Sequence, residues 1–291
     1  MFKFDFFGIG TGWFIDIDVN ATPLQITISN KVINIVKEFE DSYSRFKDTS
    51  LIGKLNIEKS LKNPPLELIQ MIKMAQDLKD VTLGSFDIMV GKRLSDNGYD
   101  KELSFKNKIS NNNLNKLVSF SKKQIVLQEN GLMDLGGIGK GFLIDKVSSY
   151  LTSEQINNFV VNAGGDIFCK SENFNKFYLE NPFDNSQAIG EIDLKNGGIA
   201  CSSSSKRSWK SGTRQFHHLI DMNSGETVNE IAAVFTYGKN ALNTDLGSTA
   251  IFVSDSKCWF NISKFLDIEF LVVFSDGKYF QTENYPGRMY R

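Results

Sequence analysis

Four glycines fall within six residues of the stretch Met133–Asp145, which reads MDLGGIGKGFLID. Glycine in a helix costs about 1 kcal/mol relative to alanine, so glycines placed just before an apolar run need a separate reason. Glycine allows backbone groups to approach a ligand closely, and the amides at a helix N-terminus attract anions. Lys140 adds a full positive charge. The stretch predicts either an anion-binding turn or a tight strand-to-helix turn packed on a sheet.

Two common nucleotide-binding motifs do not fit this stretch. The P-loop pattern GxxxxGK[ST] is absent. The segment GGIGKG contains a G-x-G-x-G pattern, but the regular βαβ units and the distant acidic residue of a dinucleotide-binding fold are missing. Any phosphate site here therefore belongs to a different architecture.

Composition excludes several classes of protein. The 291 residues carry a formal net charge of −1, with scattered basic residues, so nucleic acid and anionic membranes are not expected partners. Three widely spaced cysteines without a CxxC pair argue against a disulfide framework or a zinc site. The N-terminus lacks the pattern of a signal peptide, and no apolar run reaches the length of a membrane span. These features predict a cytoplasmic protein with no membrane segment.

The first part of the chain changes from strand to helix periodicity. Residues 13–19 alternate strictly, and 25–29 continue the alternation after a turn at 20–23, which predicts a hairpin. From Ser29 on, the apolar residues recur with the 3.6-residue period of a helix, and Ser29 or Asn30 is the predicted helix cap. The apolar stripe of this predicted helix comprises Val32, Ile35, Val36, Phe39, Tyr43 and Phe46.

The remaining pattern favours an α+β fold. Helices are predicted from Pro64-Pro65 through Leu78, after the glycine stretch with Ile144, Val147 and Leu151 buried, and over 256–266. Strands are predicted at 124–127, 158–169 with a break at a glycine pair, 176–180, 188–194, 198–202, 215–220 and 231–238, and the chain closes in a hairpin that turns at Asp276-Gly277. Residues 107–115 predict a surface connection, and 244–253 fits neither state clearly. Strands do not alternate regularly with helices and no linker interrupts the chain, so we expect one domain over 1–291, or two closely packed subdomains.

An acidic and a hydroxyl residue in ALNTDLGSTAIFV suggest a metal site. If residues 241–253 are helical, Asp245 and Thr249 lie four residues apart on one face and their oxygens could reach one cation. Such hard ligands suit Mg²⁺, which completes its shell with phosphate and water. The alternative is that Asp245 caps the helix and Thr249 is a buried helix residue.

Histidine occurs only at His217 and His218. Adjacent residues of an extended segment point to opposite faces, so only one of the two can face a given cleft. A histidine there could accept a proton, because its pKa lies near neutrality. Either residue could equally be a polar strand residue.

Seven segments in order resemble the ApbE family of flavin transferases. They are IGTGW (9–13), YSRFKDTSLIGKLN (43–56), GSFDIMVG (84–91), DLGGIGKGFLID (134–145), VNAGGDI (161–167), HLIDMNSG (218–225) and TDLGSTAIFV (244–253). The resemblance runs from about Ile9 to Gly277, with Met222 and Ser224 where the family usually has proline and threonine. It implies an α+β architecture related to the T-fold, with FAD in a central cleft and Mg²⁺ at its pyrophosphate.

The resemblance also implies roles for single residues. The side chains of Asp245 and Thr249 and the carbonyl of Gly137 would bind Mg²⁺, and His218 would be the general base. Asp245 would thereby also be a catalytic residue. The FAD site would be formed by Ile9, Phe46, Ser85, Phe86, Asp87, Lys140, Asp145 and His218.

The implied reaction is transfer of FMN from FAD to a serine or threonine hydroxyl of an acceptor flavoprotein, with release of AMP. A pyrophosphate needs neutralisation of charge, which Mg²⁺ and Lys140 would supply, and a hydroxyl needs a base. Two alternatives use the same residues. Water could replace the hydroxyl and give free FMN and AMP, or the protein could bind FAD without chemistry.

Overall fold

The computed structural model describes residues 1–100, 104, 118–206, 208–211 and 214–290, and the predicted connection at 107–115 lies outside them. Its largest element is a nine-stranded sheet in the order β1-β2-β6-β7-β8-β11-β12-β13, with β14 paired to β8. Every pairing in this sheet is antiparallel. The strands are β1 (Phe2–Gly8), β2 (Thr11–Ile17), β6 (Phe159–Ala163), β7 (Asp166–Glu180), β8 (Ala188–Ser203), β11 (Ile231–Gly238), β12 (Ile268–Phe274), β13 (Tyr279–Gln281) and β14 (Arg288–Met289).

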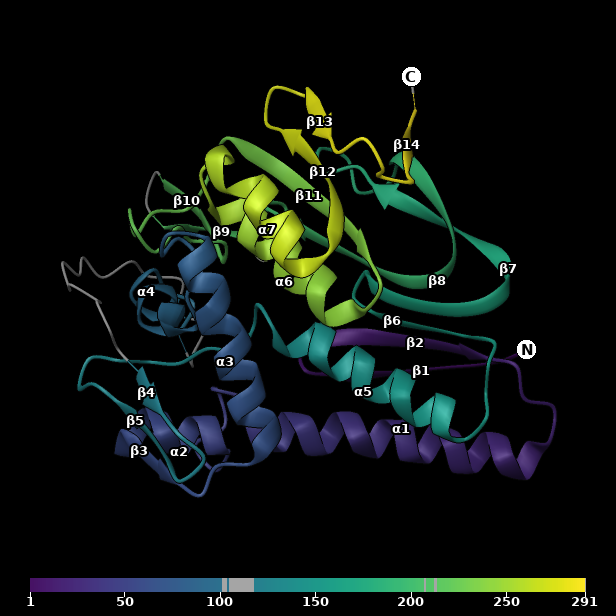
Figure 1. Cartoon of the computed structure of the whole chain (residues 1–291), viewed down its shortest axis with the longest axis horizontal. Coiled ribbons are helices and arrows are strands. Elements are labelled where there is room, and N and C mark those ends of the chain that lie inside the picture. Colours follow the sequence, from purple (N-terminus) through teal and green to yellow (C-terminus); the bar gives the residue numbers. More distant parts are fainter. Residues whose placement is uncertain (101–103, 105–117, 207, 212–213, 291) are drawn as a thin grey trace.

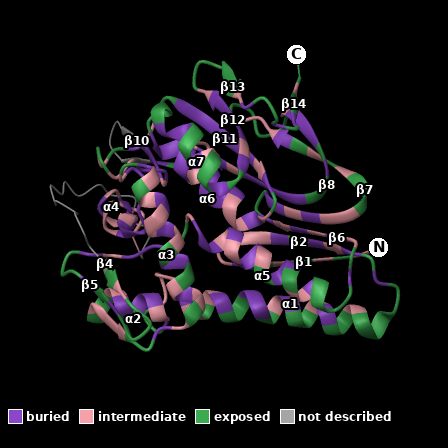
Figure 2. Cartoon of the chain, in the orientation of Figure 1, coloured by how far each residue is buried: buried purple, intermediate pink, exposed green. Residues whose placement is uncertain are grey.

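The helices of the described residues are α1 (Thr22–Tyr43), α2 (Leu51–Glu58), α3 (Leu66–Val81), α4 (Gly91–Asp96), α5 (Gly139–Ser153), α6 (Ala241–Val253) and α7 (Trp259–Leu266), with short 3₁₀ turns η1 (Ile88–Val90) and η2 (Ser256–Cys258). Of these, α1, α5, α6 and α7 cover one face of the nine-stranded sheet, whereas α2, α3 and α4 lie to its side (Figure 1). The inward residues of β2, Trp13, Ile15 and Ile17, are fully buried in one core with α1, α5 and α6. Buried residues line the sheet side of α1 and exposed ones its outer side (Figure 2). This layer brings the ends of α1, α5 and α6 together.

A second core lies on the other face, inside the bend of the long β7–β8 hairpin. Ile167 of β7, Phe235 of β11 and Leu271 of β12 are buried there together with Leu179 and Leu194 from the distal half of the hairpin. The pairing of β7 with β8 shifts register between Lys170 and Asn175, and a register shift of this kind bends a strand. The bend lets the hairpin fold over its own sheet.

Two small sheets flank the main sheet. One is β3 (Ser60–Lys62), β5 (Gln124–Leu127) and β4 (Val118–Phe120), and the other is β9 (Ser208–Ser211) with β10 (Arg214–His217). Strands and helices do not alternate in βαβ units, which confirms the α+β prediction. The prediction of a single domain stays a prediction.

Most predicted elements are confirmed. The glycine stretch opens α5, α3 follows Pro65, and 231–238 is β11 with the predicted bounds. The strand over 158–169 is broken at Gly164-Gly165 into β6 and β7, and the last hairpin turns at Asp276-Gly277. The three strands predicted between 176 and 202 form parts of the two long strands β7 and β8.

The predicted hairpin over 13–29 is wrong. Residues 25–29 belong to α1, which begins at Thr22 after the N-cap Ala21, so neither Ser29 nor Asn30 caps it. The alternation at 25–29 is misleading because Ile26 is exposed on the helix and only Ile28 joins the buried stripe. Pro23 in the first turn favours a helix start, because N–H groups at this position have no intrahelical acceptor and proline therefore loses no hydrogen bond.

The actual partner of β2 is the N-terminal strand β1, which the sequence analysis did not predict. The two strands are joined by Ile9 and Gly10, both at positive φ (47° and 74°). A β-branched residue at positive φ is strained, and Glu40 Oε2 accepts a 3.1 Å hydrogen bond from the Ile9 N–H. The turn is thereby fixed against the end of α1.

Candidate functional site

A cavity of about 790 Å³ lies where the ends of α1, α5 and α6 meet the loops around them. Pockets for small molecules and cofactors commonly measure ~300–1,000 Å³, so this cavity is large enough for a nucleotide. Its walls come from the β1–β2 turn, residues 43–47 after α1, the turn at 86–90, the glycine stretch, β8 and residues 218–220. Segments from nearly the whole sequence therefore meet at one place.

Nine of the predicted site residues line this cavity. They are Ile9, Phe46, Phe86, Asp87, Gly137, Lys140, His218, Asp245 and Thr249. Phe46 was predicted on the apolar stripe of the first helix, but α1 ends at Tyr43 and Phe46 follows in the loop. The side chain of Asp87 also pairs with Lys79 and accepts a 2.9 Å hydrogen bond from the Met89 N–H at the start of η1.

The glycine stretch brings α5 unusually close to α6. A Cβ on Gly141 would lie 2.5 Å from the Ala241 carbonyl oxygen and 2.8 Å from Asp245 Cβ, so only glycine fits. At this distance the Gly141 N–H donates a 2.8 Å hydrogen bond to Asp245 Oδ2. Asp245 is therefore held by the N-terminal turn of α5.

Gly137 lies beside Thr249. A Cβ on Gly137 would be 3.4 Å from Thr249 Cγ2 and 3.2 Å from the Phe86 ring. Thr249 and Asp245 both belong to α6, whose N-cap is Asn240. Asp245 is therefore not a helix cap, and Thr249 is half-buried at the cavity wall rather than enclosed in the core.

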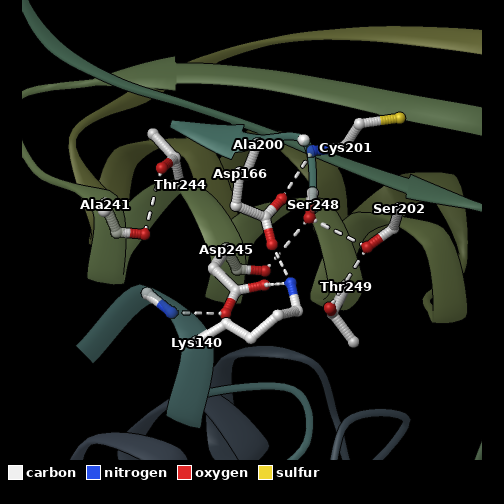
Figure 3. Close-up of polar contacts among 12 residues, drawn as sticks. Lys140, Asp166, Ala200, Cys201, Ser202, Ala241, Thr244, Asp245, Ser248 and Thr249 are labelled. Atoms are coloured by element: carbon white, nitrogen blue, oxygen red, sulfur yellow. Dashed lines mark hydrogen bonds and ion pairs between the residues drawn. The ribbon is translucent and has the colours of Figure 1, made fainter. Parts of the chain in front are cut away.

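Lys140 reaches from the first turn of α5 between two carboxylates. Its amine is 3.3 Å from Asp245 Oδ1 and forms an ion pair with Asp166, the first residue of β7 (Figure 3). The carboxylates are 4% and 3% exposed, whereas the Lys140 side chain is 21% exposed. Lys140 is therefore the most exposed side chain of this group, and it also lines the cavity.

Hydroxyl groups continue the network along α6. The Ser202 hydroxyl of β8 is 3.2 Å from Thr249 Oγ1 and 2.9 Å from Ser248 Oγ (Figure 3). Ser248 Oγ also donates a 3.1 Å hydrogen bond to the Asp245 carbonyl oxygen. The Thr249 hydroxyl is thus linked to β8 through Ser202, and Ser248 links the same network to the backbone of α6.

The two histidines have different environments. His217 is 3% exposed, accepts a 3.2 Å hydrogen bond from the Leu219 N–H at Nδ1 and therefore donates from Nε2 to the Val228 carbonyl oxygen at 2.9 Å. Burial lowers the pKa of His217 below its usual 6.5. His218 is half-buried and lines the cavity. Only one of the two adjacent histidines faces the cavity, as expected for neighbouring residues of an extended segment.

Asp145 and Ser85 do not line the cavity. The Asp145 carboxylate accepts 2.9 Å hydrogen bonds from the Ala241 and Leu242 N–H groups, so it holds the N-terminus of α6, and burial raises its pKa. Ser85 Oγ accepts a 3.0 Å hydrogen bond from the side chain of Asn223. Both side chains therefore bond to groups outside the cavity lining.

Three of the cavity residues that the sequence did not single out, Arg45, Tyr99 and Asp134, interact with one another. Arg45 forms a buried ion pair with Asp134 and donates a 2.6 Å hydrogen bond to the Tyr99 carbonyl oxygen. Its guanidinium carbon is 4.2 Å from the centre of the Phe46 ring. No local pattern marks Arg45 or Tyr99, whereas Asp134 lies at the start of the glycine motif.

The donor set suits a hard cation with few protein ligands. Among the residues that the structure describes, no three His, Cys, Asp or Glu side chains cluster as a metal site. One buried carboxylate, one hydroxyl and a bare glycine carbonyl would leave room for phosphate and water, which is the usual surrounding of Mg²⁺. The residues present therefore fit such an ion.

The fold and the cavity are those of an α+β protein with a nucleotide-sized site formed by helix ends and glycine-rich turns. The chain belongs to the ApbE family, whose model matches residues 9–272. None of the helices in the described ranges is long and apolar enough to cross a bilayer.

Curated relatives cover most of the chain. The sequence is 27% identical to an FAD:protein FMN transferase of Buchnera aphidicola over 84% of this chain and 77% of the relative. It is 23% identical to one of Klebsiella pneumoniae over 77% of this chain and 75% of the relative.

Solved structures share the fold. The ApbE protein of Thermotoga maritima superposes with a TM-score of 0.85 at 23% identity, covering 98% of this chain and 97% of its own. The flavin transferase ApbE from Vibrio cholerae gives a TM-score of 0.81 at 19% identity, with 98% of this chain and 97% of its own covered.

Proposed function

We propose that this protein is an FAD:protein FMN transferase that moves FMN from FAD to a serine or threonine hydroxyl of an acceptor flavoprotein and releases AMP. Curated relatives from two organisms carry that name. The observation that carries the proposal is that one cavity gathers Lys140, His218 and Asp245, which lie far apart in the sequence. A cation, a proton acceptor and a carboxylate are the groups that this reaction needs.

The cavity would hold FAD as substrate. Phe46 and Phe86 offer apolar ring surface, and Ile9 and Asp87 border the same space. Lys140 would contact the diphosphate, since it lines the cavity and its side chain is more exposed than the two carboxylates beside it. Ser85 and Asp145 would act from outside the cavity lining, through Asn223 and the start of α6 respectively.

Asp245, Thr249 and the Gly137 carbonyl would hold Mg²⁺. When bound, Mg²⁺ neutralises negative charge on the diphosphate and on the departing AMP oxygen. The nearness of Gly137 to Thr249 supports this assignment, because a Cβ on Gly137 would lie 3.4 Å from Thr249 Cγ2 and both residues line the cavity.

His218 would accept the proton of the acceptor hydroxyl. The hydroxyl oxygen then forms a bond to the phosphorus on the FMN side, and the bond from that phosphorus to the bridging oxygen breaks. AMP leaves with the bridging oxygen, and FMN remains on the acceptor as a phosphodiester. Lys140 would stabilise the charge that develops on the leaving phosphate.

Product analysis tests this function. Purified protein is incubated with FAD, Mg²⁺ and candidate acceptor flavoproteins, and the acceptors are examined by mass spectrometry for added FMN while AMP is measured by chromatography. Covalent FMN with equimolar AMP is expected. Free FMN with AMP would indicate hydrolysis instead, and bound FAD without AMP would indicate a binding module.

We place the reaction in the cytoplasm. The three cysteines are free, and Cys169 and Cys258 are buried, as is common for thiols in a reducing compartment. Fractionation of cells that express the native gene would test this location.

A further inference from the structure

Asp166 is a buried carboxylate that the proposed reaction does not use. It follows the Gly164-Gly165 turn, both residues of which have positive φ, and begins β7. Its Oδ1 accepts a 3.1 Å hydrogen bond from the Cys201 N–H of β8. The cavity wall does not include it. Asp166 is therefore fixed to the sheet and acts on its surroundings through its other oxygen.

That other oxygen holds Lys140. The Lys140 amine forms an ion pair with Asp166 Oδ2, whereas its distance to Asp245 Oδ1 is 3.3 Å, at the long end for a hydrogen bond (Figure 3). Asp245 Oδ2 is occupied by the Gly141 N–H. Asp245 Oδ1 is thus only weakly engaged, and it is the oxygen that faces Lys140.

Without Asp166, Lys140 would have Asp245 as its nearest carboxylate. A lysine and an aspartate in a nearly buried site attract one another strongly, and a metal ion would have to displace the ammonium. With Asp166 present, Lys140 has a carboxylate partner of its own, and Asp245 Oδ1 remains available to a cation. The position of Asp166 therefore decides which group Lys140 is paired with.

We propose that Asp166 is a positioning residue that holds Lys140 away from Asp245 and so keeps the Asp245 carboxylate available to a divalent cation. The proposal rests on the proposed function only in taking Asp245 as a metal ligand. It assigns to the VNAGGDI segment a role in metal binding through Lys140, without direct contact to the ion.

The test is a double-mutant cycle that measures Mn²⁺ affinity by electron paramagnetic resonance, without turnover. The variants are Asp166→Asn, Lys140→Met and the double variant. Asparagine retains an oxygen that can accept from the Cys201 N–H. We expect Asp166→Asn to weaken Mn²⁺ binding about tenfold when Lys140 is present and by less than about threefold in the Lys140→Met background. Lys140→Met alone should leave the affinity within about threefold of wild type.

Two results would overturn the proposal. An equal loss of Mn²⁺ affinity from Asp166→Asn with Lys140 and with Met at position 140 would show that Asp166 is a direct ligand or acts by its charge alone. A tenfold gain from Lys140→Met alone would show that Lys140 already competes for Asp245, and this variant also serves if Asp166→Asn does not fold. Lys146→Met, on the same helix but paired with Glu67 at 2.7 Å, is the matched control for loss of a positive charge and should not change Mn²⁺ binding.

The metal assay is separable from the transferase assay. If wild-type protein forms the flavinylated product while the cycle shows no coupling, only the role of Asp166 is wrong. If wild type binds Mn²⁺ no better than Asp245→Ala, the metal site itself is wrong, and both proposals are overturned.

Discussion

The Gly141 N–H donates a 2.8 Å hydrogen bond to Asp245 Oδ2 across 104 residues of sequence. This contact joins the glycine stretch to α6 and explains one of the four glycines. The backbones of α5 and α6 are in close contact at the same point, because a Cβ on Gly141 would meet the Ala241 carbonyl oxygen at 2.5 Å.

Gly141→Ala should destabilise the protein by about 1–3 kcal/mol, because backbone atoms of α6 must move to admit the methyl group. Urea unfolding followed by circular dichroism measures the change. Gly139→Ala is the matched control, since its Cβ would meet Phe39 at an ordinary 3.5 Å and alanine favours a helix. Equal stability of the two variants would contradict the close packing seen here.

Asp245→Asn should reduce Mg²⁺-dependent transfer at least about 100-fold, because the proposed cation loses its only charged protein ligand. The amide can still accept from the Gly141 N–H, so the fold should be retained. Initial rates over a titration of Mg²⁺ measure the effect. Asp267→Asn, which breaks an exposed pair with Lys239, is the control and should behave as wild type. A normal rate for Asp245→Asn would place the ion elsewhere.

His218→Gln should slow transfer by roughly 10²–10⁴-fold through loss of the proton acceptor. FAD affinity, measured by quenching of flavin fluorescence, should change by less than about threefold, since the proposed diphosphate contact is Lys140. Single-turnover rates with excess protein isolate the chemical step. A large loss of FAD affinity would instead identify His218 as a substrate contact.

Stability should fall as the pH drops below about 6.5, the usual pKa of histidine, because of His217. Burial lowers its pKa in the folded protein, so the unfolded chain takes up the proton first and protonation favours unfolding. The contribution of neutral His217 to the free energy of unfolding is complete above pH 6.5. It decreases by up to about 1.4 kcal/mol per pH unit as the pH falls from 6.5 to the lowered pKa of the folded protein. Urea unfolding between pH 7.5 and 5 measures the slope. An unchanged slope in His217→Gln would assign the effect to other groups.

The errors of the sequence analysis have a common cause. Residues 25–29 alternate over too few positions to distinguish a strand from the first turns of a helix, and Ile26 and Leu24 are exposed apolar residues that imitate the pattern. The strand Phe2–Gly8 was missed although Phe2, Phe4 and Phe6 alternate as in a strand, because residues 25–29 had been assigned as the hairpin partner of 13–19.

The sequence by itself determined the α+β class, most helices and strands, and the segments that contribute to the cavity. It did so because apolar periodicity and glycine placement are local properties, and because motif order identifies the family. The family resemblance named His218, and the tertiary structure places it on the cavity wall while His217 is buried. Only the tertiary structure decided that Asp145 supports the start of α6. The ion pairs of Lys140 with Asp166 and of Arg45 with Asp134 also depend on it. These relationships join residues distant in sequence, and packing alone sets their distances and burial.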